Sequence, residues 1–178
     1  MTSEISIQYF KTVYGELIIG DFQNQICLCD WRFRAKREMI DTRITSDLKS
    51  NFVVKNTDLI EETKNQLNEY FAKKRFEFSV PILPLGTEFQ QTVWQELMKI
   101  PYGKTTNYLE ISEKINSPKA FRAVANANGA NAISIIIPCH RVIGKNEKLV
   151  GYAGGIVAKE KLLKLESEQL FSAKNDIF

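Results

Sequence analysis

The sequence is poor in the residues that build metal centres and disulfide frameworks. Its 178 residues include one histidine, His140, and three cysteines. Catalytic zinc sites usually need two or three histidines, so zinc catalysis is disfavoured. A small, odd number of cysteines argues against a disulfide scaffold and favours a reducing compartment. We therefore expect no metal, no other cofactor and a cytoplasmic location.

Long apolar runs are also absent. No stretch approaches the ~20 apolar residues that a membrane-spanning helix needs. The first ten residues, MTSEISIQYF, lack the basic segment and apolar run of a secretory signal. The chain still has 44% hydrophobic and 11% aromatic residues, enough for a substantial core. We expect a soluble protein of one or two small domains, without a membrane partner.

The net charge of +3 is small, but it is unevenly distributed. Residues 1–83 hold 12 basic and 12 acidic residues, whereas residues 97–165 hold 11 basic and 4 acidic ones. A local excess of this size is either a solvated basic face or a modest surface for a polyanion such as DNA.

The first third of the chain has the alternating pattern of β-strands at residues 5–10, 17–19 and 26–31. Residues 58–71 change to the 3.6-residue period of a helix. We therefore expect residues 1–80 to form a small antiparallel sheet with one helix. Two prolines and a glycine then predict an extended connector at 81–85.

The rest of the chain is predicted to be mostly helical. Thr87 and Gln90 have the spacing of a capping box at the start of a helix. Asn107 can open another helix, and Ser117 before a proline predicts a third over residues 118–128. The last two, joined by a short turn, form either a helix-turn-helix or a plain helical hairpin.

One short segment brings together residues with chemical potential. An apolar run at 135–137, predicted to be extended, leads through a proline to Cys139, His140 and Arg141. The neighbouring side chains are expected to lower the pKa of the Cys139 thiol and favour its nucleophilic thiolate form. A cysteine beside a histidine is, on that pattern alone, more often structural. The remaining cysteines fit packing positions in a strand, Cys27 and Cys29.

Five blocks decide between these interpretations. They are GTEFQQTVW at 86–94, IPYG at 100–103, RAV at 122–124, IIPCHRVIG at 136–144 and GYAGG at 151–155. With the trailing residues Lys159, Leu162, Leu163 and Glu166, they closely resemble the O6-alkylguanine-DNA alkyltransferases, or methylated-DNA–protein-cysteine methyltransferases, in their bacterial and archaeal single-chain form. The resemblance covers about 86–166.

The resemblance implies an α+β fold. Residues 1–80 are loosely similar to the ribonuclease-H-like support domain of that family, with its small antiparallel sheet and helix. Residues 86–170 would form a mostly helical, winged-helix-like DNA-binding domain with a helix-turn-helix, and residues 171–178 a tail. Some members carry an N-terminal zinc, which this chain does not support because no histidine precedes His140.

The implied function is DNA repair by direct reversal. Cys139 would take the alkyl group from O6-alkylguanine, and less readily from O4-alkylthymine, in one irreversible transfer. His140 would accept the thiol proton through a water, Glu166 would orient the imidazole, and Asn131 would brace the active-site turn. This is a variant of triad logic.

The resemblance also implies a substrate pocket. Tyr108 would offer its hydroxyl to a ring nitrogen of the base, and Tyr152 would form the wall near the alkyl group. Backbone groups of Val142 and Ala153 would line the pocket. Ser134, where vertebrate members have proline, suggests a roomier pocket that tolerates bulkier alkyl groups.

The implied partner is double-stranded DNA containing alkylated guanine, bound by a monomer. The target atom lies inside the duplex, so the base must be flipped out. Arg122 would fill the gap from the minor groove. Further implied DNA contacts are Lys119, Ala123, Ala127, Asn128 and Thr106.

Three other functions fit less well. Alkyltransferase-like proteins bind lesions without transfer, but they replace the acceptor cysteine, typically with tryptophan, and Cys139 is present here. A helix-turn-helix regulator would not need the segment around Cys139. A cysteine hydrolase would need an oxyanion hole, which the sequence does not reveal.

Overall fold

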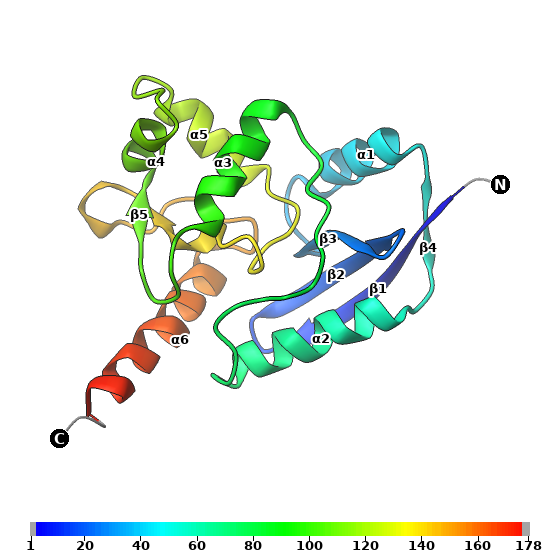
Figure 1. The fold of residues 1–178 in the computed structure, drawn as a ribbon, viewed down its shortest axis with the longest axis horizontal. Coiled ribbons are helices and arrows are strands. Elements are labelled where there is room, and N and C mark those ends of the chain that lie inside the picture. The colour runs from blue at the N-terminus through cyan, green and yellow to red at the C-terminus, as the bar shows by residue number, and fades with distance from the viewer. Residues whose placement is uncertain (1–2, 176–178) are drawn as a thin grey trace.

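A four-stranded sheet forms the centre of the N-terminal half (Figure 1). The computed structural model describes residues 3–175, with side chains up to residue 167. The strands, in spatial order, are β3 (Gln25–Trp31), β2 (Gly15–Phe22), β1 (Glu4–Thr12) and β4 (Asn51–Val54). The first three are antiparallel as predicted, but β4 pairs with β1 in parallel. The sheet is therefore mixed rather than purely antiparallel.

Two helices cover opposite faces of this sheet. α2 (Asp58–Phe71) has the predicted bounds and is capped by Thr57. Along β2, Leu17 and Ile19 join the apolar cluster of α2, whereas Ile18 joins that of α1 (Arg37–Leu48). Alternate residues of a strand point to opposite faces, which explains the division. Helix α1 was not predicted, because it buries only two residues and its apolar pattern is weak.

The C-terminal half holds four helices: α3 (Glu88–Met98), α4 (Tyr108–Lys114), α5 (Phe121–Gly129) and α6 (Ile156–Asn175). The capping box of Thr87 and Gln90 is confirmed, and so is the N-cap role of Asn107. Two short parallel strands, β5 (Thr106–Asn107) and β6 (Val142–Ile143), tie α4 to the segment after Cys139. Helix α6 continues into the predicted tail, whose last three residues lie outside the described part.

The predicted start of the third helix is wrong. Ser117 and Pro118 lie in a turn closed by the bond from the Ala120 N–H to the Ser117 carbonyl, 2.8 Å long. The chain needs these residues to reverse between α4 and α5, which pack against each other. Helix α5 therefore begins at Phe121 without a side-chain cap, and α4 and α5 form the helix-turn-helix pair.

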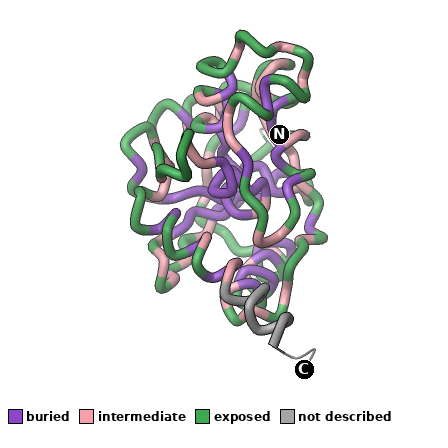
Figure 2. The backbone as a smooth tube through the Cα atoms, turned by 90° about the vertical axis from the view of Figure 1, so that its left-hand side faces the viewer, coloured by how far each residue is buried: buried purple, intermediate pink, exposed green. Residues whose placement is uncertain are grey.

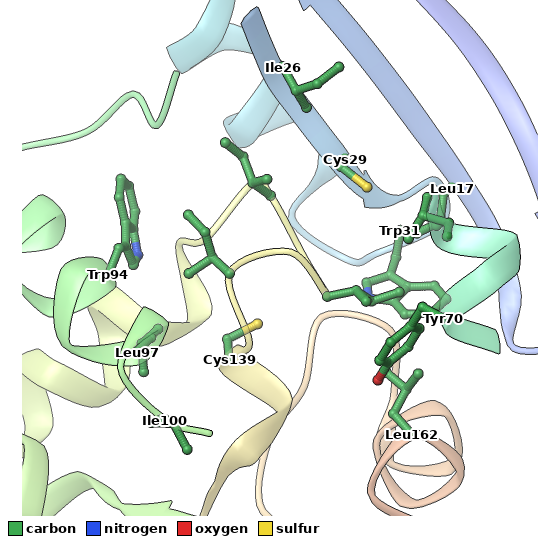
Figure 3. Close-up of a cluster of buried hydrophobic side chains, with 14 of the residues drawn as sticks. Leu17, Ile26, Cys29, Trp31, Tyr70, Trp94, Leu97, Ile100, Cys139 and Leu162 are labelled. Carbon is green, nitrogen blue, oxygen red and sulfur yellow. The ribbon is translucent and has the colours of Figure 1, made fainter. Parts of the chain in front are cut away.

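One apolar cluster joins the two halves. Residues of β2, β3 and α2 share it with residues of α3, α5 and α6, and it contains Cys139 (Figure 3). The buried backbone is accordingly concentrated in the middle of the molecule (Figure 2). The predicted connector also pairs with the sheet, since Leu83 donates to the Ile26 carbonyl. The domain limits remain a prediction. In the described part, no helix is long and apolar enough to cross a membrane.

Candidate active site

The segment before Cys139 is a compact loop. We call residues 130–138 the acceptor loop. Its backbone turns back on itself, because the Ile137 N–H donates to the Ile133 carbonyl over 2.9 Å. Ile135 has a φ of 72°, a conformation that strains a β-branched residue. The extended segment predicted at 135–137 is therefore wrong: burial of these isoleucines in a tight turn overrides their strand propensity.

Asn131 braces this loop from within. Its side-chain amide donates to the Ile137 carbonyl over 3.0 Å, and its side-chain oxygen accepts from the Ile133 N–H over 2.9 Å. The residue is buried, so these bonds are shielded from water. The neighbouring Asn128, also buried, donates to the Cys139 carbonyl over 3.5 Å. The geometry agrees with the bracing role predicted for Asn131.

Cys139 opens a short 3-10 turn, Cys139–Arg141, and faces a cavity of about 470 Å³. The cavity has the size typical of small-ligand pockets. Its lining comes from both halves of the chain: Arg34, Ala35, Lys36, Tyr108, Ala125, Asn126, Asn128, Gly129, Cys139, Val150, Gly151, Tyr152 and Ala153. Only 3% of Cys139 is exposed, so a reactant must enter this cavity to meet the sulfur.

The Cys139 thiol is not a resting thiolate. Burial raises its pKa, and a hydrogen bond from Asn131 opposes the rise only in part. The expectation that His140 and Arg141 lower this pKa is wrong, because burial raises it, His140 is neutral and Arg141 pairs with Glu166. A thiol that stays protonated needs a base during the reaction.

His140, the next residue in the chain, is held by a carboxylate. Its Nε2 lies 2.7 Å from Oε1 of Glu166. Burial lowers the pKa of His140, so the ring is neutral near pH 7. The ionised Glu166 accepts a hydrogen bond from the Nε2–H group, which leaves the lone pair of Nδ1 free. Within the described residues, that buried Nδ1 has no hydrogen-bond partner.

Glu166 is the most heavily bonded carboxylate of the site. Arg141 donates to both of its oxygens over 3.0 Å, and the Tyr70 hydroxyl donates to Oε1 over 2.7 Å. The Gly103 N–H adds a bond of 3.2 Å. Burial by itself raises the pKa of Glu166, but His140 and Arg141 outweigh it and hold that pKa at about 2. The carboxylate is therefore ionised and fixed in place.

Three predicted pocket residues do line the cavity: Tyr108, Tyr152 and Ala153. Burial raises the pKa of Tyr108, and the charge of Cys139 adds to the rise. The Tyr108 hydroxyl therefore stays protonated and can donate a hydrogen bond. The Tyr152 ring is wedged edge-on against Trp31, with centroids 5.9 Å apart.

Two predicted pocket residues do not line the cavity. The Val142 carbonyl accepts from Lys159 over 2.5 Å, and its N–H donates to the Cys139 carbonyl, so both backbone groups are occupied. Ser134 is buried and donates to Asp30 over 3.0 Å. The Ser134 side chain therefore points to the sheet, and the predicted tolerance of bulkier alkyl groups stays a prediction.

The predicted DNA contacts fall into two groups. Arg122, Lys119 and Ala123 are exposed on α5 and the turn before it. Three others are buried, and this geometry does not support contacts of their side chains with DNA: the Ala127 carbonyl accepts from Trp94 in the core, Asn128 faces the cavity, and Thr106 donates to Glu110. A helix has an inner face, and Ala127 and Asn128 lie on it.

Three residues that shape the site had no predicted role, namely Tyr70, Lys159 and Arg34, and Arg141 was expected to act on Cys139 rather than on Glu166. Arg141 and Tyr70 hold Glu166, Lys159 bonds the carbonyls of Val142 and Val150, and Arg34 lines the cavity. Lys159 is fully buried, and burial lowers its pKa to about 8. Arg141 and Lys159 belong to the blocks that resemble the family, and that membership could have pointed to them. No sequence pattern points to Tyr70 or Arg34.

Comparisons with known proteins identify the family of this chain. Residues 88–168 match the family model for the DNA-binding domain of 6-O-methylguanine DNA methyltransferase. The methylated-DNA–protein-cysteine methyltransferase of Methanosarcina mazei is 54% identical over 117 residues, which are 66% of this chain and 74% of that protein. The constitutive enzyme of Bacillus subtilis is 45% identical over 144 residues, covering 81% and 84% of the two chains.

The fold likeness extends over nearly the whole chain. The O6-methylguanine methyltransferase of Mycobacterium tuberculosis superimposes with a TM-score of 0.78 at 36% identity, covering 93% of this chain and 94% of that one. The same protein in complex with DNA gives 0.79, also at 36% identity, with coverages of 92% and 94%. The methyltransferase of Pyrococcus kodakaraensis, at 19% identity, has a TM-score of 0.51 with coverages of 91% and 98%, and shares the fold.

The fold and the site thus define a DNA-binding transferase with an α+β architecture. The chain belongs to the methylated-DNA–protein-cysteine methyltransferase family. It binds DNA and repairs it by alkyl transfer, and the alternative of a lesion binder without transfer activity is not supported.

Proposed function

We propose that Cys139 is the acceptor and that O6-alkylguanine in duplex DNA is the substrate. The observation that carries this proposal is the cavity that joins the Cys139 thiol to Tyr108. Among the three cysteines, Cys139 alone lines this cavity. A flipped base entering it would meet the nucleophile and a proton donor together.

The reaction begins with deprotonation. The proton of Cys139 passes to Nδ1 of His140, directly or through a water, while Nε2 stays bonded to Glu166. Glu166 stabilises the imidazolium that forms. The transient positive charge on His140 is compensated because Glu166 is already ionised.

The thiolate then attacks the alkyl carbon. A carbon–sulfur bond forms, the carbon–O6 bond breaks, and its electron pair leaves with the guanine. The guanine anion takes up a proton at a ring nitrogen from solvent, and the imidazolium of His140 returns its proton to solvent. Tyr108 supports that departure by hydrogen bonding a ring nitrogen of the base as charge develops. A thioether is chemically stable, so each protein molecule reacts once.

DNA binding in this proposal uses the exposed side of α5. Arg122 occupies the space of the flipped nucleotide, and the local basic excess provides salt-sensitive, sequence-tolerant affinity. Lys119 and Ala123 contact the backbone near the minor groove. The protein acts as a monomer in this proposal, because one chain supplies every group named. It acts in the cytoplasm, where reducing conditions keep its three cysteines free.

Intact mass spectrometry tests the proposal. The protein is incubated with excess duplex oligonucleotide containing one O6-methylguanine. We expect a gain of one methyl group per chain, and no gain for Cys139→Ala. An unmodified wild-type mass, or a methylated Cys139→Ala protein, would refute it. Light scattering of the protein with and without the duplex tests the monomer.

A further inference from the structure

Arg34 lies where the two halves of the chain meet. It follows β3 in the N-terminal half and is buried, with 9% of its surface exposed. Its guanidinium donates to the Gly129 carbonyl over 2.5 Å and to the Asn131 carbonyl over 3.2 Å. It also pairs with Asp30 over 2.9 Å. One side chain therefore bonds the end of α5, the acceptor loop and the sheet.

These bonds cap the carboxyl end of α5. The last carbonyls of a helix lack partners within the helix and carry partial negative charge. Arg34 donates a hydrogen bond to the Gly129 carbonyl, and Arg43 of helix α1 donates one to the Ala130 carbonyl over 2.8 Å. Two cations from the N-terminal half thus hold the helix that carries Arg122.

Asp30 extends the connection to the acceptor loop. Asp30 is fully buried and accepts hydrogen bonds from Arg34 and Arg37. It also accepts one from the Ser134 hydroxyl over 3.0 Å. The backbone repeats the link, since Cys29 donates to the Ala132 carbonyl and accepts from the Ser134 N–H. The acceptor loop is therefore fixed to β3 on both sides of Ile133.

We propose that Arg34 is a positioning residue for alkyl transfer. It sets the distance between α5, which engages DNA, and the loop that presents Cys139, and it does so without contacting DNA. The Arg34 side chain also lines the cavity, so a shift of its guanidinium alters the space in which the base must sit. This inference rests on the proposed function, because it assumes that Cys139 is the acceptor.

The test compares Arg34→Gln with Arg34→Lys and Arg32→Gln. Arg32 lies on the same loop but pairs with Glu16, away from the acceptor loop, and serves as the control. Two rates of Cys139 alkylation are measured, one with free O6-benzylguanine and one with a duplex containing O6-methylguanine. The dissociation constant for undamaged duplex and the melting temperature of each variant are measured beside them.

We expect Arg34→Gln to slow both reactions by a similar factor, on the order of ten to a hundred, as misplacement of reacting groups by about 1 Å does. Its affinity for undamaged duplex should stay within about twofold, since Arg34 makes no phosphate contact in this proposal. Arg34→Lys should recover part of the rate, because an ammonium can still donate to a carbonyl but lacks the fork. Arg32→Gln should match the wild type.

Wild-type rates for folded Arg34→Gln, well below its melting temperature, would overturn the proposal. A loss confined to DNA affinity would overturn it too, because Arg34 would then be a phosphate contact. If Arg34→Gln does not fold, Ser134→Ala removes one bond of the same network; slower transfer with unchanged DNA affinity supports the proposal, and unchanged rates contradict it. Failure of the proposed function appears separately, as a wild-type protein that is not alkylated at Cys139.

Discussion

The two halves of the chain differ in what they contribute to one site. The C-terminal half carries the proposed acceptor Cys139, the proposed base His140 and the basic excess. The N-terminal half is electrically balanced, yet its Tyr70 donates to Glu166 and its Arg34 donates to the acceptor loop. A neutral net charge therefore conceals cations and donors placed where the other half needs them.

The cysteines show the same contrast. Cys27 and Cys29 lie in β3 and are buried among apolar residues, and burial raises the pKa of Cys27 to about 12. Burial raises the pKa of Cys29 as well. Cys139 is similarly buried but faces the cavity and neighbours a histidine. Access to the cavity and a neighbouring histidine, rather than burial alone, distinguish the proposed acceptor from the other two cysteines.

Replacing Glu166, which both halves of the chain hold in place, should have the largest effect on the alkylation rate. Glu166→Gln removes the charge that orients His140 and pairs with Arg141, so we expect alkylation to slow by ~10²-fold or more. The uncompensated Arg141 should also lower the free energy of unfolding by about 3–5 kcal/mol. Single-turnover kinetics and urea unfolding measure the two effects. Glu160→Gln, exposed on the same helix, is the control; equal rates for both variants would remove Glu166 from the mechanism.

The contribution of Glu166 to stability should depend on pH. The pKa of Glu166 is held at about 2, below the ordinary value of 4.5, so its contribution is complete above pH 4.5 and is lost as the pH falls toward 2. The shift corresponds to about 3 kcal/mol. The stability difference between wild type and Glu166→Gln should shrink between pH 6 and pH 3. A difference that does not vary with pH would contradict the ionised, buried Glu166.

Arg122→Ala should separate DNA handling from chemistry. The side chain is exposed on α5 and lies outside the cavity lining. Loss of the residue proposed to fill the space of the flipped nucleotide should slow repair of duplex by about tenfold, because flipping costs a few kcal/mol. Reaction with the free base should be unchanged. Similar slowing of both reactions would show that Arg122 acts on the site itself.

Tyr70→Phe should give the smallest effect and the clearest evidence of the N-terminal contribution. It removes one hydrogen bond to a charged group, worth roughly 1.5–3 kcal/mol of stability. Because Arg141 and Gly103 still hold Glu166, the alkylation rate should fall by only a few-fold. Tyr9→Phe, at a half-exposed position on β1, is the matched control. An alkylation rate equal to that of the control would mean that Tyr70 supports the fold alone.

The sequence predicted most of what is local. The bounds of α2, the capping box at Thr87 and the N-cap at Asn107 all follow from side-chain patterns within a few residues. Cys139, His140 and Glu166 came from a motif, and the structure brings the last two into contact across 26 positions. The start of α5 was misjudged because a serine before a proline also suits a turn.

What the sequence could not provide depends on tertiary packing. The pKa of Cys139 depends on burial, which no neighbouring residue reveals. Nothing near Arg34 or Tyr70 indicates that their partners lie 95 and 96 positions away. Ser134 looked like a pocket residue in an extended segment, but the loop turns its hydroxyl toward Asp30. Partners so distant in sequence are fixed only when the sheet and the acceptor loop meet.

Peptide mapping tests the central claim most directly. Wild-type protein is reacted to completion with excess alkylated duplex, digested, and each cysteine peptide is weighed. We predict one alkyl group on the peptide containing Cys139 and none on those containing Cys27 and Cys29. Alkylation of either cysteine of β3, or an unmodified Cys139 peptide, would contradict the account.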